Sequence, residues 1–269
     1  MNRASLAELT PHVVVFATRE RARSLARTLL PRRHGRVVLT RTAVECEEAF
    51  KTALVDAALI DVGAAGGGED AWRAASLARE YPSVPFFAIT PLRAGDAPTL
   101  AHCADLEFAD FIIEGMDEVV ARELIEPHCF TTRFALALRE PPASLHLDSE
   151  LQINTWRQVV ARAGRCVRTD ELAQGLAVSR EHLSRRFAVA GAPNLKRMID
   201  LVRLIAAAEL AKNPGYDIQD LARVLGFASS SHLASTTQRV LGTRPSSLAT
   251  LRPIDLIERF SRGRGRSRS

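Results

Sequence analysis

Two helical segments in the last third of the chain carry polar side chains that could hydrogen-bond to DNA bases. In the first, Ser179–Phe187 (SREHLSRRF), Leu183 and Phe187 share one helical face. The opposite face then presents Arg180, Glu181, Ser184, Arg185 and Arg186. Arginine can donate to guanine O6 and N7, and glutamate can accept from cytosine N4. This face is therefore predicted to read base edges.

The second segment has the same form but fewer charges. Leu233 and Val240 continue its apolar side. Its exposed face is predicted to carry Ser230, Ser231, His232, Ser235, Gln238 and Arg239. A serine hydroxyl can hydrogen-bond to several bases, so this face is expected to discriminate less between base sequences.

Each polar segment follows a short apolar helix and a turn. Leu172, Ala173 and Leu176 give the helical period before the first segment. Ile218, Leu221, Ala222 and Leu225 give it before the second. Helix, short turn and second helix form the unit that lays its second helix in a DNA major groove. Two such units, joined by one long helix over about residues 194–212, form the predicted all-α domain.

The domain resembles the DNA-binding domain of the AraC/XylS family of bacterial transcription regulators. The matching residues are Leu172-Ala173, Ser179–Phe187, Gly191, Arg203 with Ala207, Ile218–Phe227 and Gly242–Leu248. The resemblance implies binding to two successive major-groove segments about one helical turn apart. It also implies double-stranded DNA as partner and RNA polymerase as a candidate contact. Arg185 is its first candidate for a base contact, because the family commonly contacts bases at that position. A homodimer is expected from the N-terminal half, described below.

Three residues of the second unit depart from the family pattern. The family usually has arginine at Ser235, phenylalanine at Thr237 and lysine at Gln238. The second unit should therefore bind phosphate less tightly, and the first unit should dominate specificity. An alternative is a protein-interaction adaptor whose second unit no longer reads DNA.

The N-terminal half alternates apolar runs with amphipathic stretches. Strands are predicted at residues 12–17, 36–40, 57–62, 85–90 and 110–113, and helices at 19–30, 44–53, 71–81, 99–104 and 117–124. Continuous apolar strands alternating with helices indicate a parallel sheet covered on both faces. The predicted fold is a doubly wound α/β domain with a five-stranded parallel sheet, followed by the all-α domain.

This half resembles the receiver domain of response regulators, with Asp61 as the candidate phosphoacceptor and Thr90 as the switch hydroxyl. A working receiver would hold Mg²⁺ with an acidic pair where Ala17 and Thr18 stand, and would have a lysine where Glu114 stands. Phosphoryl transfer depends on such cationic charge. The departures favour dimerisation or phosphorylation-independent signalling. The alternative is a phosphorylation-controlled regulator acting through Asp61.

Composition and charge agree with this organisation. Residues 128–269 hold 22 Lys and Arg against 12 Asp and Glu, a net of +10, which suits a polyanionic partner. The four cysteines show no metal spacing, no catalytic constellation stands out, and no cofactor is implied. No apolar run is long enough for a membrane span, so a cytoplasmic protein at the nucleoid is expected.

The predicted boundaries are a receiver-like domain at 1–127, a linker with a Pro141-Pro142 hinge at 128–148, the DNA-binding domain at 149–251, and a basic disordered tail at 252–269. The tail should add salt-sensitive, non-specific affinity for DNA.

Overall fold

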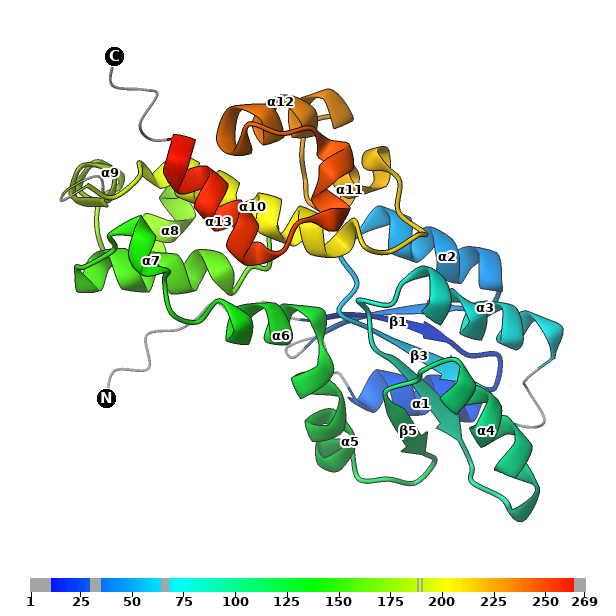
Figure 1. Cartoon of the computed structure of the whole chain (residues 1–269). Coiled ribbons are helices and arrows are strands. Elements are labelled where there is room, and N and C mark those ends of the chain that lie inside the picture. The colour runs from blue at the N-terminus through cyan, green and yellow to red at the C-terminus, as the bar shows by residue number, and fades with distance from the viewer. Residues whose placement is uncertain (1–10, 30–34, 64–67, 188, 190, 264–269) are drawn as a thin grey trace. The chain divides into compact units, whose positions relative to one another are not determined.

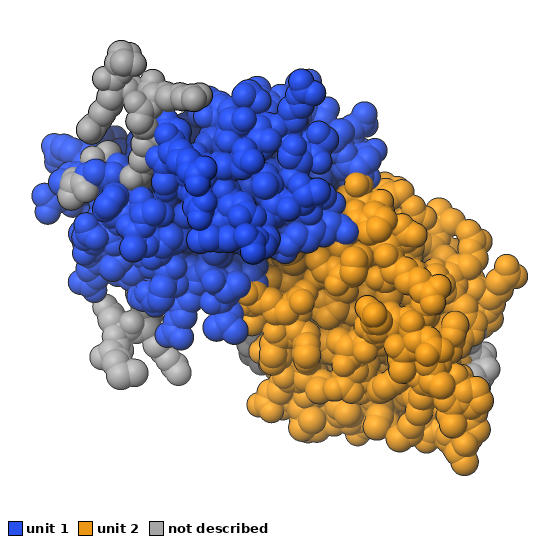
Figure 2. Space-filling model, viewed as in Figure 1, with its two compact units in different colours: residues 1–9, 134–212, 217–269 blue, residues 10–133, 213–216 orange. Residues whose placement is uncertain are grey.

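The computed structural model describes residues 11–29, 35–63, 68–187, 189 and 191–263. These residues form two compact units (Figure 2). The sheet unit runs through residues 11–133 and includes 213–216, and the helical unit contains the described residues of 134–212 and 217–269.

The sheet unit is built on five parallel strands (Figure 1). They are β1 (His12–Phe16), β2 (Arg36–Thr40), β3 (Ala57–Asp61), β4 (Phe86–Thr90) and β5 (Asp110–Ile113), in the spatial order β2-β1-β3-β4-β5. Every residue of β1, β3 and β4 is buried, as expected for inner strands covered on both faces. The predicted doubly wound fold is confirmed, with strand bounds within one residue of those predicted.

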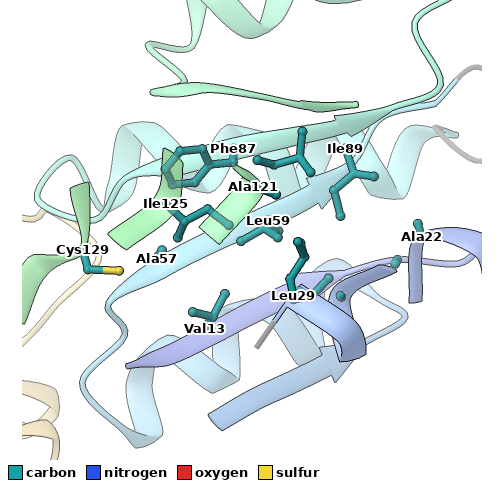
Figure 3. Close-up of a cluster of buried hydrophobic side chains, with 14 residues drawn as sticks. Val13, Ala22, Leu29, Ala57, Leu59, Phe87, Ile89, Ala121, Ile125 and Cys129 are labelled. Carbon is teal, nitrogen blue, oxygen red and sulfur yellow. The ribbon is translucent and has the colours of Figure 1, made fainter. Parts of the chain in front are cut away.

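Helices cover both faces of this sheet. They are α1 (Glu20–Leu29), α2 (Ala43–Thr52), α3 (Glu69–Glu80), α4 (Ala97–Asp105) and α5 (Glu118–Ile125). On one face, Leu29 of α1 and Ile125 of α5 pack with Val13, Leu59 and Phe87 of the strands (Figure 3). On the other face, Phe50 of α2 stacks on Tyr81 with ring centroids 4.3 Å apart. The two cores fix the strand ends, where the polar residues lie.

The helical unit is organised around one long buried helix, α10 (Leu195–Leu210). The other helices are α7 (Glu150–Val160), α8 (Thr169–Gly175), α9 (Arg180–Phe187), α11 (Ile218–Val224), α12 (Ser230–Leu241) and α13 (Pro253–Arg262). The pairs α8–α9 and α11–α12 are the two predicted helix-turn-helix units. Asn194 caps α10 by accepting a hydrogen bond from the Arg197 amide at 2.8 Å.

The linker predicted at 128–148 is largely built into the two units. Helix α6 (Phe130–Ala137) begins in the sheet unit, where the Thr131 amide donates to Asp56 at 3.0 Å. The division between the units falls within α6, after Arg133. Leu145 and Leu147 follow the proline pair and are buried in the helical unit. The segment predicted as a linker thus contains helix α6 and, after the proline pair, buried apolar residues.

The prediction of a disordered tail at 252–269 was wrong for residues 253–262, which are helical. Residues 253–262 form α13, which packs against α10 and α12. Leu256, Ile257 and Phe260 are buried on one face of this helix. An amphipathic helix gains its stability from such a face even where arginines are frequent. Residues 264–269 lie outside the described residues.

We predict that Phe260→Ala destabilises the helical unit by about 3–5 kcal/mol, because it removes a fully buried aromatic ring. Ile254→Ala on the same helix is the matched control, since Ile254 is 51% exposed. Urea unfolding followed by hydrogen–deuterium exchange in α10 and α12 measures both variants. Equal, small effects would show that α13 contributes nothing to the fold.

Candidate functional site

Helix α9 is capped at its start and joined to α7 at its end. At its start, the Ser179 hydroxyl accepts the His182 amide at 3.1 Å. At its end, the buried Gln152 side chain donates to the Phe187 carbonyl at 2.7 Å. Leu183 and Phe187 are fully buried between these points. The helix therefore presents a defined outer face.

That outer face carries the predicted first set of side chains. All five are exposed: Arg180, Glu181, Ser184, Arg185 and Arg186. Arg180 lies 3.5 Å from Asp170 in an exposed ion pair. Arg185 and Arg186 form no ion pair with another described residue. These two arginines can therefore contact a nucleic acid without first breaking an internal bond.

Helix α12 presents the second predicted set, but part of it is already bonded within the protein. Ser231, His232, Ser235, Gln238 and Arg239 are exposed, and Ser230 is half-buried. Arg239 donates to Asp200 of α10 at 2.8 Å. Ser235 donates to the His232 carbonyl of its own helix at 3.1 Å. The second face thus offers fewer free donors than the first.

Thr237 occupies the place of the family phenylalanine without leaving an unsatisfied group. It is completely buried, and its hydroxyl donates to the Leu233 carbonyl one turn earlier at 2.8 Å. A buried hydroxyl without a partner would cost free energy, and this bond removes that cost.

The turn between α11 and α12 is held by the buried Arg203. In the sequence, this residue stood out only as a match to the AraC/XylS family. Arg203 of α10 is 7% exposed, and it donates to the Leu225 carbonyl at 3.0 Å. Its guanidinium carbon lies 3.8 Å from the centroid of the Phe227 ring. Burial lowers the pKa of Arg203, while Cys166 and Asp200 act in the opposite direction. No local pattern in the sequence predicts this long-range contact.

A second group of polar residues meets at the carboxyl ends of the sheet strands. Asp61 ends β3 and is fully buried. The Nε of Arg19 lies 3.1 and 3.0 Å from the two carboxylate oxygens of Asp61. The Nη1 of Arg19 lies 2.5 Å from Glu114, whose side chain is 7% exposed. One guanidinium therefore bridges two buried carboxylates.

Sequence reasoning placed Asp61 correctly at this edge but did not include Arg19. The sequence analysis placed Ala17 and Thr18 where a working receiver has its acidic metal ligands, and it expected Glu114 to repel phosphate. The structure pairs Glu114 with Arg19 instead. Burial would lower the pKa of Arg19, but its hydrogen bond with Asp61 and the charges of Asp61 and Glu114 raise it above its usual value.

Gly63 makes room for this arginine. A Cβ atom at Gly63 would lie 2.4 Å from Nη2 of Arg19, well inside van der Waals contact. The Gly63 amide also donates to Asp61 at 3.3 Å. The lack of a side chain at Gly63 therefore leaves room for the ion pair at the start of the loop after β3. Its residues 64–67 lie outside the described residues.

Thr90 lies at the end of the neighbouring strand but is bonded away from Asp61. Its buried hydroxyl donates to Asp96 at 3.2 Å and accepts the Leu92 amide at 3.2 Å. Asp96 in turn accepts the Arg93 amide at 2.7 Å. Among the residues placed in the structure, no group of three or more His, Cys, Asp or Glu side chains could hold a metal ion.

We predict that Arg19→Met destabilises the sheet unit by about 3–5 kcal/mol at pH 7, because two buried carboxylates lose their counterion. Arg21→Met is the matched control: Arg21 is 86% exposed and 3.9 Å from Glu114. Adding Asp61→Asn to Arg19→Met should recover part of the loss. Hydrogen–deuterium exchange of β1, β3 and β4 in urea measures the loss in the free energy of unfolding. A loss in Arg19→Met as small as that in Arg21→Met would contradict the prediction.

The comparison with protein families agrees with the geometry of the helical unit. Residues 172–250 match the model of a helix-turn-helix domain, of the AraC type. No curated protein matches the sequence. Within the described chain, no helix combines the length and apolar character that a membrane crossing requires.

Two solved structures are similar to this chain. Full-length FixJ from B. japonicum has a TM-score of 0.38 and 14% identity, over 85% of this chain and 96% of that chain. A response regulator protein from Burkholderia pseudomallei, with a phosphorylated aspartic acid, calcium ion and citrate, has a TM-score of 0.37 and 16% identity. The match covers 66% of this chain and 99% of that chain. The receiver-like fold itself follows from the strand order and pairing. Residues 172–250 therefore form a helix-turn-helix domain of the AraC type, which indicates a DNA-binding transcription regulator, and the N-terminal unit has a receiver-like fold.

Proposed function

We propose that this regulator binds two successive major-groove segments of DNA, one with α9 and one with α12. The observation that carries the proposal is the exposed polar face of α9, with five predicted contact residues, of which Arg185 and Arg186 form no ion pair with another residue that the structure describes. The net charge of +10 over residues 128–269 supplies attraction to phosphate. A homodimer in the cytoplasm, with RNA polymerase as a contact, is the expected form.

The first unit should provide most of the sequence discrimination. Arg185 is free to form two hydrogen bonds with guanine, which contribute about 1–3 kcal/mol of discrimination. On α12, Arg239 would have to leave Asp200 before it could bind DNA in the same way. Helix α12 is therefore proposed mainly to position the protein on DNA. It should contribute less to sequence discrimination than α9 does.

The sheet unit is proposed to act without phosphorylation, through dimerisation or another signal. Phosphoryl transfer to Asp61 would need a cation near the transferring group and a free carboxylate oxygen. Arg19 supplies positive charge but contacts both Asp61 oxygens, and Glu114 adds negative charge beside them. Attack by Asp61 would require Arg19 to leave two buried carboxylates.

We predict that selection of random duplex DNA by the full-length protein enriches a two-part site with centres about 10 base pairs apart. Arg185→Ala should reduce discrimination at the α9 half-site roughly tenfold, because it removes a two-bond guanine contact. Ser235→Ala, its matched control on α12, should change discrimination little. Equal losses would contradict dominance of the first unit. Salt-sensitive binding with no enriched site would favour the adaptor alternative.

We predict that Mg²⁺ with beryllofluoride or acetyl phosphate leaves DNA affinity unchanged within about twofold. The reason is that Arg19 already occupies both oxygens of Asp61. Binding titrations and intact-mass measurement check this, with Asp61→Asn as the control. A phosphoryl adduct and an affinity change that both disappear in Asp61→Asn would establish the phosphorylation-controlled alternative.

A further inference from the structure

The turn before α12 orients the side chain of His232, although this side chain is exposed. The Ala228 amide donates to Nδ1 of the imidazole at 3.4 Å. The ring also meets Phe227 edge to face, with centroids 5.6 Å apart and an interplanar angle of 76°. The imidazole therefore has a defined direction although its side chain is exposed.

The Phe227 ring is in turn held by Arg203. Phe227 is 6% exposed, and the Arg203 guanidinium lies over its face at 3.8 Å. A cation over an aromatic face is attractive, and more so when both groups are desolvated. The hydrogen bond from Arg203 to the Leu225 carbonyl holds the backbone of the same turn. A continuous set of contacts thus joins the buried α10 to an exposed residue of α12.

The bond to Nδ1 determines which hydrogen-bonding group His232 offers to the outside. In a neutral imidazole, one nitrogen accepts and the other carries the proton. Because Nδ1 accepts the Ala228 amide, the proton lies on Nε2. Within the described part of the chain, no residue bonds to Nε2. His232 consequently presents a single N–H donor.

We propose that His232 is a specificity-determining residue whose Nε2–H donates to an acceptor on a base edge, with Arg203 and Phe227 as its positioning residues. The proposal rests on the DNA-binding function proposed above and gives α12 a defined chemistry. In the major groove, guanine, adenine and thymine all present acceptors, whereas cytosine presents its N4 amino donor. His232 should therefore reject cytosine at one position of the α12 half-site.

The other residues of this face do not offer the same fixed donor. Ser235 and Arg239 are bonded within the protein. Gln238 has both a donor and an acceptor in its amide, and the Ser230 and Ser231 hydroxyls can do either. His232 is thus the side chain of the second unit best arranged to discriminate by hydrogen-bond polarity.

The first experiment determines the His232 tautomer in the full-length protein by two-bond ¹H–¹⁵N NMR correlation at pH 8. We expect protonated Nε2 and unprotonated Nδ1 in the native chain. Phe227→Leu keeps the turn apolar but removes the aromatic contact, and it should mix the two tautomers. Arg203→Met should do the same, and Arg203→Lys should recover part of the native signal. A native chain protonated on Nδ1 would overturn the proposal.

The second experiment repeats the random-DNA selection with two variants. His232→Gln retains an N–H donor and should keep most of the preference. His232→Leu should lose roughly tenfold discrimination against cytosine at one α12 position while leaving the α9 half-site unchanged. Loss of affinity equally for all sequences would mean a phosphate contact and overturn the base assignment.

The two proposals fail in different ways. A native two-part site with no change in His232→Leu would overturn the role of His232 and leave the proposed DNA-binding function intact. Absence of any enriched site for the native chain would overturn the proposed function and the role of His232 with it.

Discussion

A buried charge must be paired, and this constraint shapes the functional region of each unit. In the sheet unit, Arg19 lies between Asp61 and Glu114, and Gly63 leaves space for its guanidinium. In the helical unit, Arg203 is buried against a carbonyl and an aromatic face. Removing either partner would leave an uncompensated charge or donor in a low-dielectric interior, which is more costly than the pair itself.

The two arginines bind different kinds of groups. Arg19 contacts both oxygens of Asp61 and also pairs with Glu114. Arg203 donates to the Leu225 carbonyl and lies over the Phe227 ring. The same type of side chain therefore joins two carboxylates in one unit and a carbonyl and a ring in the other. The difference lies in which groups satisfy the guanidinium.

Much of the architecture could be predicted because it depends on local periodicity. The runs VVVF, AALI and FFAI within β1, β3 and β4 are apolar at every position, as expected of strands covered on both faces. The exposed face of α9 follows from the positions of Leu183 and Phe187 by the helical period. The prediction of a disordered tail failed because arginine-rich composition outweighed the spacing of Leu256, Ile257 and Phe260.

The contacts that decide function were harder to predict because they join distant parts of the chain. Arg19 reaches Asp61 across 42 positions, and Arg239 reaches Asp200 across 39. Strand order determines the first contact and helix packing the second, and neither leaves a local signal. The departures of α12 from its family pattern were visible in the sequence, but their outcome was not. Ser235 and Thr237 donate to carbonyls of their own helix, and in the same unit the turn before α12 orients His232. A helix that loses charged contacts can still discriminate bases if one remaining donor is held in a single orientation.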